Sequence, residues 1–213
     1  MIPGPASASY ADSLDAPPPP RLRRRIARLV TEVLAPAPVA AALLFVISWQ
    51  SSSGPEQALV WAGLSILFAS LIPISYVLHR VRQHRLSDRH VVVRRQRPLP
   101  LAVAIVSVLI GLAVLSAVGA PRTLVALVGA MGVGLIVALA VTLFWKMSIH
   151  TAVVAGAAVI LVLVFGLVWL LLVPFVALAG WSRVELSDHT PAQVLVGAAL
   201  GALVAAVMFP LLR

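Results

Sequence analysis

The chain has 213 residues, of which 61% are hydrophobic and 11% are charged, and its formal net charge is +9. This composition excludes an ordinary soluble domain and indicates an integral membrane protein. The absence of cysteine excludes disulfides, thiolate nucleophiles and cysteine-ligated metal sites. The basic excess favours anionic lipid headgroups as partners. Nucleic acid is a poor partner because no basic stripe is interleaved with stacking aromatic residues.

The N-terminal residues 1–20 are rich in Pro, Ser and Ala and predict a disordered tail. A cluster of arginines that starts at Arg21 follows this tail, and no convincing cleavage site accompanies it. The region therefore does not match a secretory signal peptide. We expect residues 21–213 to form a single transmembrane helical domain, because the linkers at 50–56 and 119–122 leave no room for a folded extramembrane domain.

The apolar residues gather in long segments, and a helix needs about 20 residues to cross the hydrocarbon core. The segments are approximately 27–50, 57–79, 100–118, 122–145, 151–181 and 191–212. The sequence therefore predicts an all-α fold, a polytopic transmembrane helical bundle with six core spans. Gly197 and Gly201 form a small-xxx-small pair, for which packing within the chain is favoured over dimerisation. The oligomeric state stays open.

The fifth apolar segment is too long for one upright helix and too short for two full spans. Gly166 near its middle offers a place to turn. We favour a hairpin of two short helices, about 151–165 and 167–181, over one long tilted span. A hairpin would return the chain to the side it left and place His189 on the same membrane face as His150, whereas a single span would separate them.

Lysine and arginine collect on one side of this predicted topology. Five arginines lie in the segment 21–28 and seven in the loop 80–97, and Lys146 and Arg183 join them, while two arginines fall on the opposite side. The positive-inside rule then assigns the basic side to the cytoplasmic face of the cell membrane.

Three polar islands interrupt the apolar chain, at 94–98, 146–152 and 182–197. Ionisable groups at membrane depth are expensive and usually mark a site. The hairpin topology places all three islands on one side, so we predict that they converge on a single anion-sized cavity.

The islands carry residues at a recognisable spacing. These residues are Arg97-Pro98 in the first island, Ser148, His150, Thr151 and Ala152 in the second, and Ser182-Arg183 with His189 in the third. In this order they resemble the three signatures of the type-2 phosphatidic acid phosphatase superfamily, K-x6-R-P, P-S-G-H and S-R-x5-H-x3-D. The resemblance spans approximately residues 90–200.

The resemblance implies a membrane enzyme that hydrolyses a lipid phosphate or a prenyl diphosphate. His189 would be the nucleophile that forms a phosphohistidine, and His150 would protonate the leaving oxygen. Arg97 and Arg183 would bind phosphate oxygens bidentately, together with Ser148 and the amides at the start of its helix. The resemblance implies neither a metal nor another cofactor.

The chain departs from the family pattern in the second and third signatures. Gln193 stands where the family has the Asp that orients the nucleophilic histidine. Gln can fix the tautomer of an imidazole but cannot stabilise an imidazolium by charge, and Asp188 is an alternative orienting group. Met147 and Ile149 replace the Pro and Gly of the second signature, and Lys146 is a compensating cation there.

The first signature departs from the pattern as well. His90 stands at the position of the family Lys, seven residues before Arg97, and Arg94 and Arg95 are possible substitutes for that cation. We therefore count His90 and Arg94 among the phosphate-binding candidates.

Several rival interpretations stay open. Arg183 and His189 could form a buried polar pair that only locks two helices. The chain could be a catalytically inactive relative that binds anionic lipid or a protein partner, or a prenyl-diphosphate enzyme of another reaction type. A transporter is a weaker alternative because repeated halves are not evident. Among substrates, a prenyl phosphate or diphosphate is favoured over a glycerolipid because the surroundings of the islands are narrow and apolar.

Overall fold

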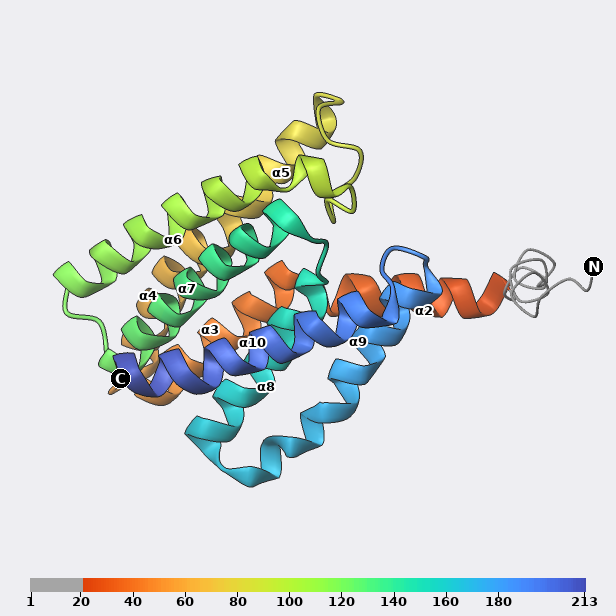
Figure 1. Cartoon of the computed structure of the whole chain (residues 1–213). Coiled ribbons are helices and arrows are strands. Elements are labelled where there is room, and N and C mark those ends of the chain that lie inside the picture. The colour runs from red at the N-terminus through yellow and green to blue at the C-terminus, as the bar shows by residue number, and fades with distance from the viewer. Residues whose placement is uncertain (1–20) are drawn as a thin grey trace, which may run out of the picture.

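The computed structural model describes residues 21–213, and the tail predicted at 1–20 lies outside the described residues. The described part is helical and contains no strand, and its helices pack into an elongated bundle (Figure 1). The α-helices are α2 (Arg21–Val33), α3 (Pro36–Ser51), α4 (Pro55–Ile66), α5 (Ile72–Arg82), α6 (Pro98–Ala117), α7 (Arg122–Phe144), α8 (Ile149–Phe165), α9 (Val173–Glu185) and α10 (Pro191–Leu212). The π-helical turn η1 (Leu67–Leu71) joins α4 to α5, and η2 (Arg94–Gln96) and η3 (Leu167–Leu172) are short 3-10 helices.

The described residues include five helices that are long and apolar enough to cross a membrane, or six when the bent pair α2 and α3 counts as one span. Many large apolar side chains face outward, as in Phe144, whose exposed fraction is 85%. Such a surface suits lipid rather than water. The predicted all-α transmembrane bundle is confirmed.

The first predicted span, 27–50, is not one helix. The chain bends by 43° between α2 and α3. Ala35 adopts an extended conformation, with φ −68° and ψ 152°, directly before Pro36, and the residue before a proline avoids the helical region. The prediction of a continuous span is wrong at this point, and the bend turns α2 into a separate amphipathic helix that packs against α9.

The fifth apolar segment forms the predicted hairpin. Helix α8 ends at Phe165, and Gly166 reverses the chain with φ 93°, a conformation that favours glycine. The second arm begins as η3 and continues as α9, so it reaches Glu185 rather than 181. Figure 1 shows the two arms returning to the same end of the bundle. The starts of α8 and α10 therefore lie together.

Helix α10 approaches α8 closely through glycines. A Cβ atom on Gly201 would clash with the carbonyl oxygen of Ala152, and one on Gly197 would clash with that of Ser148. Small residues allow this approach, which brings packing energy to helices surrounded by lipid. Packing within the chain, as expected for this glycine pair, is confirmed.

The apolar core lies toward the end of the bundle opposite the polar islands. It includes Leu44, Ile47, Leu115, Leu124 and Phe209, each at most 1% exposed. There the late turns of α3, α6 and α10 meet the first turns of α7. The polar islands lie at the other ends of these helices, so the bundle has one apolar and one polar end.

Candidate functional site

Arg183 lies in the last turn of α9 and His189 in the loop that follows, which begins with a Schellman turn. Asp188 N donates to Arg183 O at 3.0 Å, and Ser187 N donates to Val184 O at 2.9 Å. Ser187 takes the left-handed position of this turn with φ 60°. His189 N also donates to Arg183 O, at 3.2 Å. The five-residue spacing thus folds His189 back onto the last turn of α9.

Helix α10 begins with a capping box formed by Thr190 and Gln193. Gln193 N donates to Thr190 Oγ1 at 3.4 Å, and Thr190 N donates to Gln193 Oε1 at 3.3 Å. The prediction that Gln193 orients His189 is wrong, because its side-chain oxygen satisfies the helix end instead. Nδ1 of His189 is buried and has no hydrogen-bond partner within residues 21–213.

Helix α8 begins at a second cap, formed by Ser148. Its Oγ accepts from Thr151 N at 3.4 Å, and its backbone N donates to Gln193 O at 3.0 Å. These bonds tie the start of α8 to the start of α10. Ser148 is fully buried. Because its Oγ acts as the acceptor of the cap, only its hydroxyl hydrogen is left for the predicted bond to phosphate.

Arg97 joins the three polar islands. Its Nε donates to Val91 O at 2.8 Å, its Nη1 donates to Met147 O at 2.7 Å, and its Nη2 lies 3.2 Å from His189 Nε2. The side chain is buried, with 2% exposed. The predicted convergence of the islands is confirmed by these contacts.

Arg183 is also buried and has donors to spare. Its Nη2 lies 2.9 Å from Asp188 Oδ2, and its Nη1 donates to Thr31 Oγ1 at 3.5 Å. The contact with Asp188 is an ion pair without hydrogen-bond geometry, so Nε and Nη2 have no hydrogen-bond partner among the described residues. Leaving buried donors unpaired is costly. An anion beside Arg183 would satisfy them.

Lys146 closes this part of the site. Its Nζ donates to the carbonyl oxygen of Asp188. Burial, and then the nearby charge of Arg97, lower the pKa of Lys146 from its ordinary value. Together, Arg97, Lys146, Arg183 and His189 form what we call the arginine group.

His189 is neutral in this environment. Burial first, and then the charges of Arg97, Arg183 and Lys146, lower its pKa to about 3. Every nitrogen of Arg97 carries hydrogen, so Nε2 of His189 faces a donor and accepts from it when the ring hydrogen is on Nδ1. The same Nε2 also lies 3.2 Å from Met147 O. In the tautomer with hydrogen on Nδ1, the Nε2 lone pair is directed at the guanidinium and is suited to attack an anion bound there; in the other tautomer, Nε2 donates to Met147 O.

The loop before α6 is organised by Asp88. Its Oδ1 accepts from His90 N at 2.8 Å, and its Oδ2 accepts from Val92 N at 3.2 Å. Between them, Val91 adopts φ 47°, which is unusual for a β-branched residue and costs on the order of 1–3 kcal/mol. The bond from Arg97 to Val91 O helps to hold this conformation.

His90 and His150 lie side by side at the start of α8. Their ring centroids are 5.1 Å apart with an edge-to-face angle of 62°. His90 Nε2 lies 3.0 Å from Glu32 Oε1 on α2. His150 is 4% exposed, and its Nε2 has no hydrogen-bond partner in the described part of the chain. We call Glu32, His90 and His150 the histidine group.

The contribution of α2 was missed by sequence reasoning, which treated its arginines as topology signals. Thr31 Oγ1 donates to Ser182 Oγ at 3.1 Å and accepts from Arg183. Glu32 also pairs with Arg89. The adjacent Thr and Glu in a helix rich in arginine were the available signal, but nothing in the sequence shows that α2 bends toward this end.

Arg94 lies outside the site. Its Nη1 donates to Thr142 O at 3.0 Å and to Leu143 O at 2.8 Å, which caps the end of α7. The prediction that Arg94 binds phosphate is wrong, because its guanidinium satisfies these carbonyls. Arg95 is exposed.

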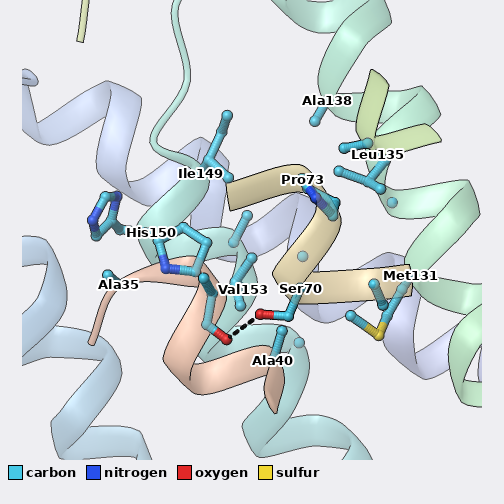
Figure 2. A pocket seen from close by; sticks show the side chains of 18 of the residues that line it. Ala35, Ala40, Ser70, Pro73, Met131, Leu135, Ala138, Ile149, His150 and Val153 are labelled. Carbon is cyan, nitrogen blue, oxygen red and sulfur yellow. Dashed lines mark hydrogen bonds between the residues drawn. The ribbon is translucent and has the colours of Figure 1, made fainter. Parts of the chain in front are cut away.

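An apolar cavity of about 520 Å³ opens beside the histidine group and Arg97, whereas Lys146, Arg183 and His189 are not among its lining residues. Its walls come from α3, α5, α6, α7, α8 and α10, and Glu32, His90, Arg97 and His150 also line it. Figure 2 shows His150 on one side of the cavity, with Pro73, Met131 and Leu135 on other walls. The lining follows α8 from His150 to Ile160, which is about 15 Å at the rise of an α-helix.

The kink in the α4–α5 span shapes one wall of this cavity. The π-helical turn η1 precedes Pro73, whose ring and missing N–H disturb a regular helix. Ser70 Oγ donates to Ala37 O at 2.9 Å, the bond drawn in Figure 2. This bond holds the kinked span against the start of α3.

Comparison with models of protein families, with curated proteins and with solved structures found no match to this chain. Function is therefore argued from the site. Within residues 21–213, no three His, Asp or Glu side chains are placed to hold a metal ion. The arrangement offers a neutral imidazole beside two buried guanidinium groups, next to an apolar cavity. It suits a ligand with an anionic head and an apolar tail.

Proposed function

We propose that the chain is a membrane-embedded phosphatase that hydrolyses a lipid phosphate or prenyl diphosphate through a phosphohistidine at His189. One observation carries the proposal: the buried Nε2 of His189 lies 3.2 Å from Nη2 of the buried Arg97. Buried donors of Arg183 without hydrogen-bond partners support it. The resemblance of the three islands to type-2 phosphatidic acid phosphatases points to the same chemistry.

The arginine group would bind the phosphoryl group and present it to His189. Guanidinium groups match phosphate oxygens bidentately, and fixed charges in a dry site stabilise the charge that develops during displacement. Nε2 of His189 attacks phosphorus, and the bond from phosphorus to the leaving oxygen breaks. Water then attacks the phosphohistidine, which releases phosphate and regenerates the imidazole.

The apolar cavity would hold the hydrocarbon part of the substrate. It extends about 15 Å along α8 from His150, between helices of the bundle. We favour a prenyl phosphate or diphosphate over a two-chain glycerolipid because one chain fits a single cavity. Faster phosphate release from phosphatidate or lysophosphatidate than from farnesyl or longer prenyl diphosphates would overturn this preference.

The test is a phosphate-release assay on purified protein with the four substrate types. Wild type should release phosphate, and His189→Ala should reduce the rate to background. His79→Ala is the matched control, because His79 is an exposed histidine on α5 whose ring forms a hydrogen bond with the Gln83 side chain. A labelled substrate should leave acid-labile phosphate on wild type but not on His189→Ala. Equal rates in all three proteins would refute the proposal.

We also propose that the polar end of the bundle faces the cytoplasm, as the positive-inside rule predicts. The native chain has no cysteine, so Ser87→Cys in the exposed loop before α6 introduces a single reporter thiol. An impermeant thiol reagent should label this variant only after cells are lysed. Labelling of intact cells would place the polar end outside.

One observation favours a second candidate, a catalytically inactive relative that binds an anionic lipid. Nδ1 of His189 has no hydrogen-bond partner in the described chain, because Gln193 is used by the capping box. Retention of a lipid phosphate by wild type, with no phosphate release even in Gln193→Asp, would support this candidate over the phosphatase.

A further inference from the structure

We propose that His90, held by Glu32, is the acid that protonates the leaving oxygen, a role that the family resemblance would give to His150. This inference rests on the proposed phosphatase function. It assigns a catalytic role to His90 and a positioning role to Glu32, a residue that the signatures do not include.

The bond between His90 and Glu32 suits a proton donor. His90 Nε2 lies 3.0 Å from Glu32 Oε1, and the backbone N of His90 donates to Asp88 Oδ1 at 2.8 Å. The carboxylate accepts from Nε2, which fixes the ring of His90 and leaves Nδ1 available for the substrate. The side chains of His90 and Glu32 are 17% and 40% exposed, so solvent can replace a proton that His90 has lost.

His150 lacks these features. It is 4% exposed and its Nε2 has no hydrogen-bond partner in the described residues. Its ring meets His90 edge to face, at 5.1 Å between centroids. A buried imidazolium without a carboxylate partner would be costly, so His150 is better suited to fix the His90 ring than to carry the proton.

Arg97 contacts both His189 and the segment that follows His90. Its Nη2 faces His189 Nε2, and its Nε donates to the carbonyl oxygen of Val91, the residue after His90. Phosphoryl transfer needs the attacking and leaving atoms roughly in line on opposite sides of phosphorus. His90 and Glu32 also line the cavity that would hold the tail. The leaving oxygen, which carries that tail, would therefore lie on the His90 side.

The step balances without a further reactant. The lone pair of His189 Nε2 forms the bond to phosphorus, and the electrons of the breaking P–O bond go to the leaving oxygen. That oxygen takes a proton from His90, from Nδ1 because Nε2 is engaged by Glu32. In the second step a water molecule attacks phosphorus, and neutral His90 accepts a proton from that water. The charged and titratable groups that face His90 in this cycle are Glu32 from α2, Asp88 and Arg89 from its own loop, and His150 from α8.

The test compares two leaving groups on the same tail. Farnesyl monophosphate expels an alkoxide, which needs a proton, whereas farnesyl diphosphate expels a phosphate ester whose second pKa is about 6. His90→Gln should lower kcat about 100-fold or more on the monophosphate and only a few-fold on the diphosphate. Glu32→Gln should show the same leaving-group dependence to a smaller degree, because the ring of His90 loses the carboxylate that positions it. His79→Ala should match wild type on both substrates.

Each other outcome has a distinct meaning. Equal losses on both substrates in His90→Gln would overturn the inference while leaving the phosphatase intact. A leaving-group dependence that appears in His150→Gln instead would return the acid to His150. If His90→Gln fails to fold, equal losses on both substrates in Glu32→Gln would overturn the inference by themselves. Wild type that releases no phosphate from either substrate would refute the proposed function.

Discussion

The arginine group and the histidine group meet at Arg97, but the fold builds them differently. Three members of the arginine group lie at helix ends: Arg183 in the last turn of α9, His189 in the loop after it, and Lys146 before α8. Arg97 reaches His189 from the start of α6, across 92 residues. The histidine group depends on the contact of Glu32 with His90, 58 residues away. Local spacing therefore encodes the pair Arg183 and His189, whereas the packing of distant segments brings Arg97 to the first group and Glu32 to the second.

The two groups also differ in charge. The arginine group gathers three cations around one imidazole, which lowers the pKa of His189. The histidine group adds a carboxylate to its imidazoles. The cations of the first group attract an anion, whereas the carboxylate of the second positions an imidazole. The experiments below test whether this division of charge is also a division of chemical roles.

Arg97→Lys should have the largest effect because Arg97 links the two groups. A lysine cannot present the rigid fork of donors that meets Val91 O, Met147 O and His189. We expect phosphate release to fall about 10²–10³-fold. The thermal unfolding midpoint should also fall, since each carbonyl left unpaired in a buried site costs about 1–3 kcal/mol.

Arg95→Lys is the control for this variant, because Arg95 is an exposed arginine on the short helix η2, which ends directly before Arg97. It should resemble wild type in the phosphate-release assay and in the unfolding midpoint. If Arg97→Lys were as active as Arg95→Lys, Arg97 could not be the bridge between the groups.

Much of the fold could be predicted from the sequence because apolar length and glycine placement are local signals. The hairpin at Gly166 followed from a segment too long for one span. The spacing of Arg183 and His189 predicted their proximity, since a helix end and a short loop separate them. The bend at Ala35 was not predicted, because a long apolar stretch suggested a continuous helix despite Pro36.

The errors within the site share one cause. Gln193 and Arg94 are polar residues next to helix ends, and both satisfy backbone groups there. From sequence alone, a polar side chain that caps a helix resembles one that faces a ligand. Only the structure shows which hydrogen bonds are already formed, and only the structure shows that Glu32 lies beside His90.

The stability of the protein should depend on pH through His189. Its folded pKa of about 3 lies below the ordinary value, so the unfolded chain binds the proton more tightly and stability rises with pH. The contribution is full above about pH 6.5, is lost as the pH falls, and levels off near pH 3. We expect the unfolding midpoint of His189→Gln to fall less steeply than that of wild type over this range. Parallel curves would show that His189 is not the depressed group.

Gln193→Ala should have a small effect on phosphate release, because the side chain caps α10 and does not contact His189. Loss of the capping bond should cost about 1 kcal/mol of stability, measured as a lower unfolding midpoint, while kcat stays within a few-fold of wild type. A loss of kcat as large as that in Arg97→Lys would restore Gln193 as the orienting residue of His189.

The smallest change in stability should come from relief of backbone strain at Ser187, and a matched position, Val91, lies in the other loop. Ser187 before His189 and Val91 after His90 both have positive φ, 60° and 47°. Ser187 is exposed, so Ser187→Gly removes strain without loss of packing and should raise stability by about 0.5–1 kcal/mol.

Val91 is 8% exposed, so Val91→Gly also loses a buried side chain, worth about 1.5–3 kcal/mol. A raised unfolding midpoint in Ser187→Gly and a lowered one in Val91→Gly would show that the turn beside the arginine group is strained only in its backbone. The loop beside the histidine group would, by contrast, need the Val91 side chain to hold its conformation.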